Sequence, residues 1–252
     1  MYQEERMEMI LNHLNEYKRI SVEKICNLCN VSRDTARRDL VKLEEKGAIL
    51  RTRGGALLPS LSKEIKSYKD RLHNDSKEKR AIGKLAASLV KNGDKIIMDT
   101  STTVQACSEF LQVDNCTVIT NSINQADILS NRPEIRIHLL GGQLNQEQRF
   151  SYGPSVISML SNYYVDKAFI SACGLTEEGV TVIFEEDGFV MKKMIEQADQ
   201  VILLVDSSKF GKKGFFKVTD LSQIDIIITN QLPDKPLMDV FKGYEINVML
   251  AE

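Results

Sequence analysis

Basic and hydroxyl side chains gather on one face of a helix that the sequence predicts for residues 32–47. Ala36, Leu40 and Leu43 recur at helical spacing on the opposite, apolar face. Guanidinium, ammonium and hydroxyl groups donate hydrogen bonds to base edges and phosphates. The predicted DNA-reading residues of this helix are Ser32, Arg33, Thr35, Arg37, Arg38 and Lys42.

A short basic hairpin is predicted directly after this helix. Ile49 and Leu50 begin one strand, Gly54-Gly55 forms the tight turn, and residues 56–58 return. Arg51 and Arg53 lie on the hairpin, where a wing would contact the DNA backbone.

Small polar residues follow several apolar runs in the second half of the chain. The run 99–103 leads straight into a predicted helix, so its N–H groups and hydroxyls are suited to a phosphate. The alternative is that each Ser or Thr merely caps a helix. If the runs are parallel strands, their ends converge on one polar pocket, with these candidate ligand-binding residues: Asp99, Thr100, Ser101, Thr102, Thr103, Thr120, Asn121, Ser122, Gly141, Gly142 and Gly174.

Charged residues complete this set of candidates. Lys209 follows Asp206-Ser207-Ser208 and would supply a cation to a bound anion. Glu185 heads an acidic trio, 185–187, that would line the same pocket; the alternative is a solvated loop between Gly179 and Gly188.

Two further helices are predicted to position the basic helix. Apolar residues at helical spacing over 5–14 predict the first, and Ser21 is a good N-cap for the second. With the short turn at 30–31, this order gives a winged helix-turn-helix. The alternative is a small helical dimerisation module with a solvated charged face.

Apolar strands that alternate with helices are predicted to position the polar residues of the second half. This pattern is typical of a mostly parallel α/β sheet. The predicted strands are Lys95–Asp99, Thr117–Thr120, Ile135–Leu140, Lys167–Ala172, Val201–Asp206 and Ile224–Thr229, and the predicted helices are 103–112, 123–131, 154–162 and 188–198.

Length and charge favour two domains. The 252 residues carry a net charge of −2. Residues 1–60 hold 11 basic and 9 acidic residues, hence +2, and the remainder holds 33 − 11 = 22 against 35 − 9 = 26, hence −4. We expect a winged helix-turn-helix at 1–58, a polar linker at 59–76 and an α/β effector-sensing domain at 77–252.

Several classes of protein are disfavoured. The chain has neither a long apolar run nor a signal peptide, so we expect a cytoplasmic protein without membrane contact. Cys26 and Cys29 form a C-x-x-C without a second ligand pair, which favours buried thiols over a zinc or redox site. A P-loop and a dinucleotide fingerprint are both missing, so we expect no cofactor and no metal.

The N-terminal motifs resemble the DNA-binding signature of the DeoR family of bacterial sugar-metabolism regulators. The matching elements are Val31-Ser32, the run 35–40, Leu43-Glu44, Gly47 and the run 53–56. This ordered match is far more specific than a generic helix-turn-helix.

The second half is similar to the DeoR sensor domain, through residues 99–103, 120–122, 140–142, 169–174 and 206–211. That resemblance implies a fold like that of ribose-5-phosphate isomerase and a phosphorylated sugar as effector. The family usually has Gly in place of Ser101, and Glu-Ala in place of Asp187-Gly188. Both departures bear on the identity of the ligand.

We therefore expect a repressor of a carbohydrate operon that binds double-stranded operator DNA as a homo-oligomer, modulated by a phosphorylated sugar. An alternative is a sugar-phosphate isomerase with a DNA-binding appendage, using Asp99, Glu185 and Lys209 as base and cation. We expect sensing and not catalysis. Activation, or an architectural role without a ligand, is a third reading.

Overall fold

The computed structural model describes residues 2–45, 48–52, 54–57, 67–73 and 77–252. Its internal contacts divide the chain into two compact units, Met1–Ser67 and Tyr68–Glu252. Each unit has its own hydrophobic core.

The N-terminal unit is a three-helix domain with a small antiparallel sheet. Its helices are α1 (Gln3–Tyr17), α2 (Val22–Cys29) and α3 (Arg33–Glu45), and its strands are β1 (Arg19–Ser21), β2 (Leu50–Thr52) and β3 (Gly55–Leu57). Apolar residues at helical spacing close the core, among them Ile10, Leu14, Ile25, Ala36, Leu40 and Leu43. The predicted winged helix-turn-helix is confirmed, and Ser21 caps α2 by accepting a bond from Lys24 N at 3.0 Å.

Strand β1 extends the predicted hairpin into a sheet of order β1-β3-β2. The sequence gives little sign of β1, since it has three residues and a single buried side chain, Ile20. Gly55 permits the pairing: a Cβ atom there would lie 1.9 Å from the carbonyl oxygen of Ile20. Any other residue at position 55 would push the wing away from β1.

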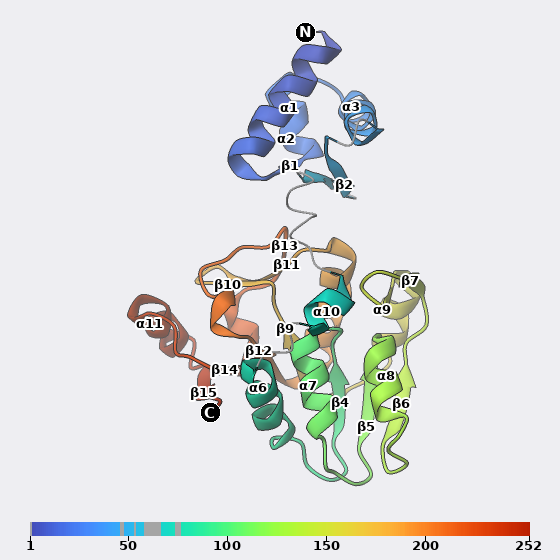
Figure 1. Ribbon diagram of the computed structural model, residues 1–252, viewed down its shortest axis with the longest axis vertical. Helices are drawn as coiled ribbons and strands as arrows, with labels where there is room; N and C mark the ends of the chain where they lie inside the picture. Colours follow the sequence, from blue (N-terminus) through green and yellow to red (C-terminus); the bar gives the residue numbers. More distant parts are fainter. Residues whose placement is uncertain (1, 46–47, 53, 58–66, 74–76) are drawn as a thin grey trace. The chain divides into compact units, whose positions relative to one another are not determined.

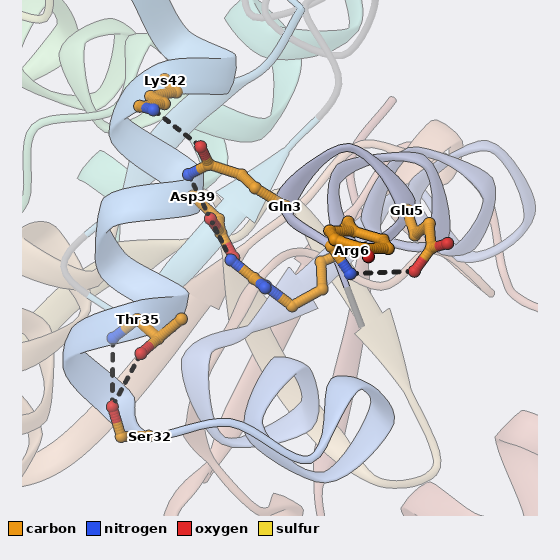
Figure 2. A network of polar contacts seen from close by, with 8 residues as sticks. Gln3, Glu5, Arg6, Ser32, Thr35, Asp39 and Lys42 are labelled. Atoms are coloured by element: carbon orange, nitrogen blue, oxygen red, sulfur yellow. Dashed lines mark hydrogen bonds and ion pairs between the residues drawn. The ribbon is translucent and has the colours of Figure 1, made fainter.

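A buried ion pair ties α1 to α3 (Figure 2). The Asp39 carboxylate is fully buried and accepts bonds from Arg6 Nε at 2.7 Å and from Arg6 Nη2 at 3.1 Å. Gln3 Nε2 donates to the same carboxylate at 2.7 Å. This bidentate arrangement fixes the rotation of α3 about its own axis, and hence the face that it exposes.

The C-terminal unit is built on a seven-stranded sheet of order β15-β14-β12-β9-β4-β5-β6. Every adjacent pair is parallel, which confirms the predicted α/β class. Its strands are β4 (Lys95–Met98), β5 (Thr117–Thr120), β6 (Arg136–Leu139), β9 (Val165–Ser171), β12 (Ala198–Leu204), β14 (Ile226–Thr229) and β15 (Asn247–Leu250).

Helices cover both faces of this sheet (Figure 1). On one face α6 (Lys77–Ala87), α7 (Thr102–Phe110) and α8 (Ile123–Leu129) pack against Ile96, Met98 and Val118. On the other face α9 (Pro154–Leu160), α10 (Glu185–Glu196) and α11 (Lys235–Gly243) share a core with Ile97 and Ile119. Successive strand residues thus point to opposite faces, and both faces are apolar.

Several elements differ from the sequence prediction. The strand β15 and helix α11 at the end of the chain are additional, as are α5 (Tyr68–His73), β7 (Gln143–Asn145), β8 (Phe150–Tyr152), β10 (Gly174–Thr176), β11 (Gly179–Val182), β13 (Phe216–Thr219), and the short 3-10 helices η1 (Ser207–Lys209) and η2 (Leu221–Gln223). The reading of 185–187 as a solvated loop is wrong, because α10 begins at Glu185, where acidic side chains favour a helix N-terminus.

Replacing Arg6 with Met leaves the Asp39 carboxylate buried without its cation. We expect the N-terminal unit to lose about 3–5 kcal/mol of stability, as is usual when one partner of a buried pair is removed. Hydrogen exchange of the α1 and α3 amides in the full chain measures this loss.

The double variant Arg6→Met/Asp39→Leu is the matched control, and it should recover most of the stability because no charge remains buried. A loss below about 1 kcal/mol for Arg6→Met alone would show that the pair does not hold α1 against α3.

Candidate functional site

The first turn of α3 is fixed by two hydroxyl side chains that we predicted to contact DNA. Ser32 Oγ accepts a bond from the Thr35 backbone N–H at 3.2 Å and lies 3.0 Å from Thr35 Oγ1. Ser32 therefore caps the helix, a task that competes with direct contact to a ligand. The structure places both residues at the exposed N-terminal end of α3 (Figure 2).

Three arginines of α3 are exposed. Arg37 lies 4.0 Å from Asp34, and both side chains are more than half exposed, so this pair contributes little to stability. Within the described part of the chain, Arg33 and Arg38 make no hydrogen bond or ion pair. Their guanidinium groups are therefore available to an external anion or base edge.

Lys42 lies further along α3 and joins the contacts between α1 and α3. Its Nζ donates to Gln3 Oε1 at 2.6 Å, while Gln3 Nε2 bonds to Asp39. Figure 2 shows this chain of contacts from Lys42 through Gln3 to Asp39 and Arg6. Lys42 is exposed, yet its ammonium group must leave Gln3 or share it to reach a phosphate.

Of the two arginines predicted on the wing, the structure describes Arg51. The Arg51 backbone N–H donates to Glu44 Oε1 at 3.2 Å, and its guanidinium lies 3.5 Å from Glu44 Oε2. Glu44 thus holds the start of the wing against the end of α3. Arg53, the second predicted wing contact, lies outside the described residues.

Asp99 occupies the end of β4 and organises the carboxyl edge of the sheet. Its Oδ1 accepts from the Ser101 backbone N–H at 2.8 Å, and its Oδ2 accepts from the Ser171 N–H at 2.6 Å. Burial raises the pKa of Asp99 to about 6, although these two N–H groups oppose the rise. The carboxylate therefore fixes the loop before α7 and the end of β9 together.

The predicted phosphate-binding run, 99–103, forms the entry to α7. Ser101 Oγ accepts from the Val104 backbone N–H at 3.0 Å and caps the helix. A glycine, which the resemblance leads us to expect at this position, has no side chain to make this bond. Thr100, Thr102 and Thr103 are buried around the same turn.

The next strand brings its own polar residues to this edge. β5 pairs with β4, with Thr120 opposite Met98, so Asn121 lies beside Asp99. Thr120 Oγ1 donates to Met98 O at 2.8 Å, and Ser122 Oγ caps α8 through the Gln125 N–H at 3.3 Å. Both hydroxyl groups thus make hydrogen bonds that stabilise the fold. Asn121 Nδ2 donates to Ser151 O at 2.8 Å, but its Oδ1 is buried without a donor in the described structure.

The three candidate glycines differ in their surroundings. A Cβ atom on Gly174 would lie 2.2 Å from the carbonyl oxygen of Lys212, so close backbone approach accounts for this glycine. A Cβ atom on Gly142 would lie 2.6 Å from the carbonyl oxygen of Tyr152, whereas Gly141 is exposed with open space around it. Gly141 and Gly142 begin the connection from β6 to β7.

Two predicted charged residues approach this edge from other elements. Lys209 ends the short helix η1, and its charge lowers the pKa of the Cys173 thiol, which burial raises overall. Glu185 begins α10, and its Oε2 is buried without a partner among the described residues.

Two further charged residues bear on this site: Asp187, which was expected only as a member of the acidic trio 185–187, and Arg71, which was not a predicted ligand-binding residue. Burial and the neighbouring Asp99 raise the pKa of Asp187 to about 7. The positive charge of Arg71 opposes the rise of the pKa at Asp99, at Asp187 and at Cys173. We name Arg71, Asp99, Asn121, Asp187 and Lys209 the carboxyl-edge cluster.

The sequence held weak signals for both residues. Asp187 belongs to the acidic trio, but no periodicity singles it out from Glu185. Arg71 falls in the polar stretch 59–76 that predicts a linker, in which Tyr68 is a rare aromatic residue. Tyr68 is 1% exposed and anchors α5, so this aromatic residue is the feature of the sequence that indicates a packed element here.

Two family models match the chain. The DeoR-like helix-turn-helix domain matches residues 6–61, and the DeoR C terminal sensor domain matches residues 74–231. Partial structural likeness extends to ribose 5-phosphate isomerase A from Methanocaldococcus jannaschii, which covers 52% of this chain and 53% of that chain, with 23% identity and a TM-score of 0.37. In the part of the chain that the structure describes, no helix combines the length and apolarity needed to cross a membrane.

Relatives match along the whole chain. The HTH-type transcriptional repressor GlcR of Bacillus subtilis is 54% identical over 100% of this chain and 98% of its own length. The lactose phosphotransferase system repressor of Streptococcus mutans is 33% identical over 98% and 99%, and the glycerol-3-phosphate regulon repressor of Escherichia coli is 30% identical over 100% of both. The chain belongs to the DeoR family of transcriptional regulators.

Proposed function

We propose that this chain represses genes of carbohydrate metabolism and that a phosphorylated sugar modulates its binding to operator DNA. The observation that carries the proposal is an exposed basic face on α3, where Arg33 and Arg38 have no partner among the described residues, in a chain that matches named repressors of sugar regulons from end to end. Residues 1–58 would bind DNA, the expected linker 59–76 would connect only before Tyr68, and the unit that begins at Tyr68 would sense the effector in the cytoplasm.

The mode of DNA binding follows from α3 and the wing. The N-terminal half of α3 presents Arg33, Arg37 and Arg38, and a helix of this kind fits the major groove. Arg38 would bond to a base edge, while Lys42 and the wing residues Arg51 and Arg53 would contact phosphates. A homo-oligomer would present two such helices to a twofold operator.

The effector would bind at the carboxyl edge of the sheet. The N-terminus of α7, with its N–H groups and buried threonines, favours a phosphate. Lys209 adds a positive charge nearby, whereas Asn121 and Glu185 present acceptor atoms suited to sugar hydroxyls. Effector binding changes operator affinity if it favours one of two conformations or assemblies.

We further propose that the edge binds a sugar phosphate without converting it. Asp99 is a poor general base, since both of its carboxylate oxygens already accept backbone N–H groups. Turning the Asp99 carboxylate toward a substrate would break both bonds, and would disturb the loop before α7 and the end of β9.

Arg38→Ala should weaken operator binding by about 1–3 kcal/mol, the range for loss of a side chain that reads a base edge. Gel-shift titration with the operator at physiological salt measures the change. Arg136→Ala, which removes an exposed arginine from β6 in the other unit, is the control and should leave affinity unaltered. Equal affinity of Arg38→Ala and wild type would rule out the assigned reading face.

A panel of sugar phosphates should include at least one that shifts operator affinity by about 5-fold or more, the usual lower range of allosteric coupling. The panel contains pentose, hexose and triose monophosphates, each compared with its unphosphorylated sugar. Gel shift at fixed protein concentration gives the response. If every member leaves operator affinity unchanged, the sensing half of the proposal is wrong.

Incubation of the chain with ribose 5-phosphate should yield no ketose product above the rate of the buffer control. Nuclear magnetic resonance of the sugar carbons follows both isomers directly. Steady interconversion that vanishes in Asp99→Asn would instead establish the isomerase alternative.

A further inference from the structure

Helix α5 is the element of the C-terminal unit that comes first after the wing, with residues 58–67 between β3 and α5. It is anchored firmly within its own unit. The Tyr68 hydroxyl donates to Gln105 Oε1 of α7, and the Tyr68 N–H donates to Glu147 O at 3.3 Å. Gln105 lies in the same helix whose N-terminus is the proposed phosphate site.

Arg71 joins α5 to the connection between β7 and β8. Its Nη2 donates to the neutral Gln148 Oε1 at 2.7 Å, and its Nε is buried without an acceptor in the described structure. Its charge opposes the raised pKa values of Asp99 and Asp187, yet no hydrogen bond joins it to either carboxylate among the described residues. A guanidinium with a buried, unused donor has an unfilled place for an anion.

Two acceptor atoms of the candidate site are unpaired as well. Asn121 is fully buried, and its Oδ1 accepts no hydrogen bond from the described residues. Glu185 Oε2 is also buried and likewise accepts no hydrogen bond from them. Leaving such atoms unpaired away from water is costly. A cation, a buried N–H donor and two acceptors together match a ligand that carries both an anionic group and hydroxyls.

We propose that Arg71 binds the anionic group of a sugar phosphate and that this contact makes α5 the coupling element between the sensor and the DNA-binding part. The proposal rests on the function proposed above and assigns it a specific side chain. Bidentate pairing with phosphate replaces the bond to Gln148 and fixes the guanidinium by two parallel N–H contacts. The position of α5, from which the chain continues to the wing, then depends on whether the site is filled.

The geometry gives this role to Arg71 in preference to Lys209. Lys209 lies on η1, which is followed by further elements of the sensor unit, so its movement has no short covalent path to the wing. Arg71 has that path through residues 58–67. Lys79 reinforces the end of α5, because its Nζ donates to Arg71 O at 3.1 Å.

The test compares Arg71→Gln with Lys69→Gln, an exposed cation on the same helix. Both are used as full chains, in gel-shift titrations with the same panel of pentose, hexose and triose monophosphates. Without sugar phosphate, Lys69→Gln should bind operator as wild type does, and the response of each variant is scaled to its own operator affinity without sugar phosphate. For the panel member to which wild type responds, Arg71→Gln should need about tenfold more for half of the effect, and Lys69→Gln the same concentration as wild type.

Hydrogen exchange supplies the second readout. In wild type, amides 68–73 should exchange more slowly when that sugar phosphate is present, and in Arg71→Gln they should not. Arg71→Lys keeps the charge but loses the planar fork, so it should fall between the two. It also carries the test if Arg71→Gln fails to bind operator.

The outcomes separate this inference from the proposed function. If wild type responds and Arg71→Gln responds at the same concentration, Arg71 does not bind the anion. If exchange of 68–73 is unaffected by the sugar phosphate in wild type, α5 does not couple the site. If wild type responds to no member of the panel, the proposed function itself fails and the inference fails with it.

Discussion

The carboxylate of Asp99 is the contact on which the sensor unit depends. By accepting N–H groups from Ser101 and from Ser171, it fixes the loop that begins α7 and the end of the neighbouring strand β9. Gln125 Nε2 adds a bond to Asp99 O at 3.0 Å, which ties in α8. A parallel sheet brings the ends of its strands to one edge, but this carboxylate determines which backbone and side-chain atoms that edge exposes.

A second buried carboxylate has the same role in the DNA-binding unit. Asp39 holds α1 and α3 together through Arg6 and Gln3, and therefore fixes the direction in which the free arginines of α3 point. Both units thus use a buried acidic residue to orient the surface that meets a ligand. Such charges are retained at a cost in desolvation, which is consistent with a positioning role.

Periodicity in the sequence predicts the elements whose side chains repeat over several turns or strands. Local pattern predicts a basic helix and strands such as Thr117–Thr120, and the structure contains them as α3 (Arg33–Glu45) and β5. Elements held by distant partners were not foreseen: β1 needs Gly55, and α5 needs Gln105 to accept from Tyr68. The candidate site shows the same division. Asp99 could be predicted because it directly follows an apolar strand, whereas Arg71 could not, because it lies in a stretch whose composition is that of a linker.

We expect the carboxyl edge and the DNA-reading face to be energetically coupled, and thermodynamic linkage makes this coupling directly measurable. Calorimetric titration of the full chain with an active sugar phosphate, alone and with saturating operator DNA, gives two affinities. If the two sites are coupled, these affinities differ by the same factor by which the sugar phosphate changes operator affinity. Equal affinities in the two titrations would contradict it.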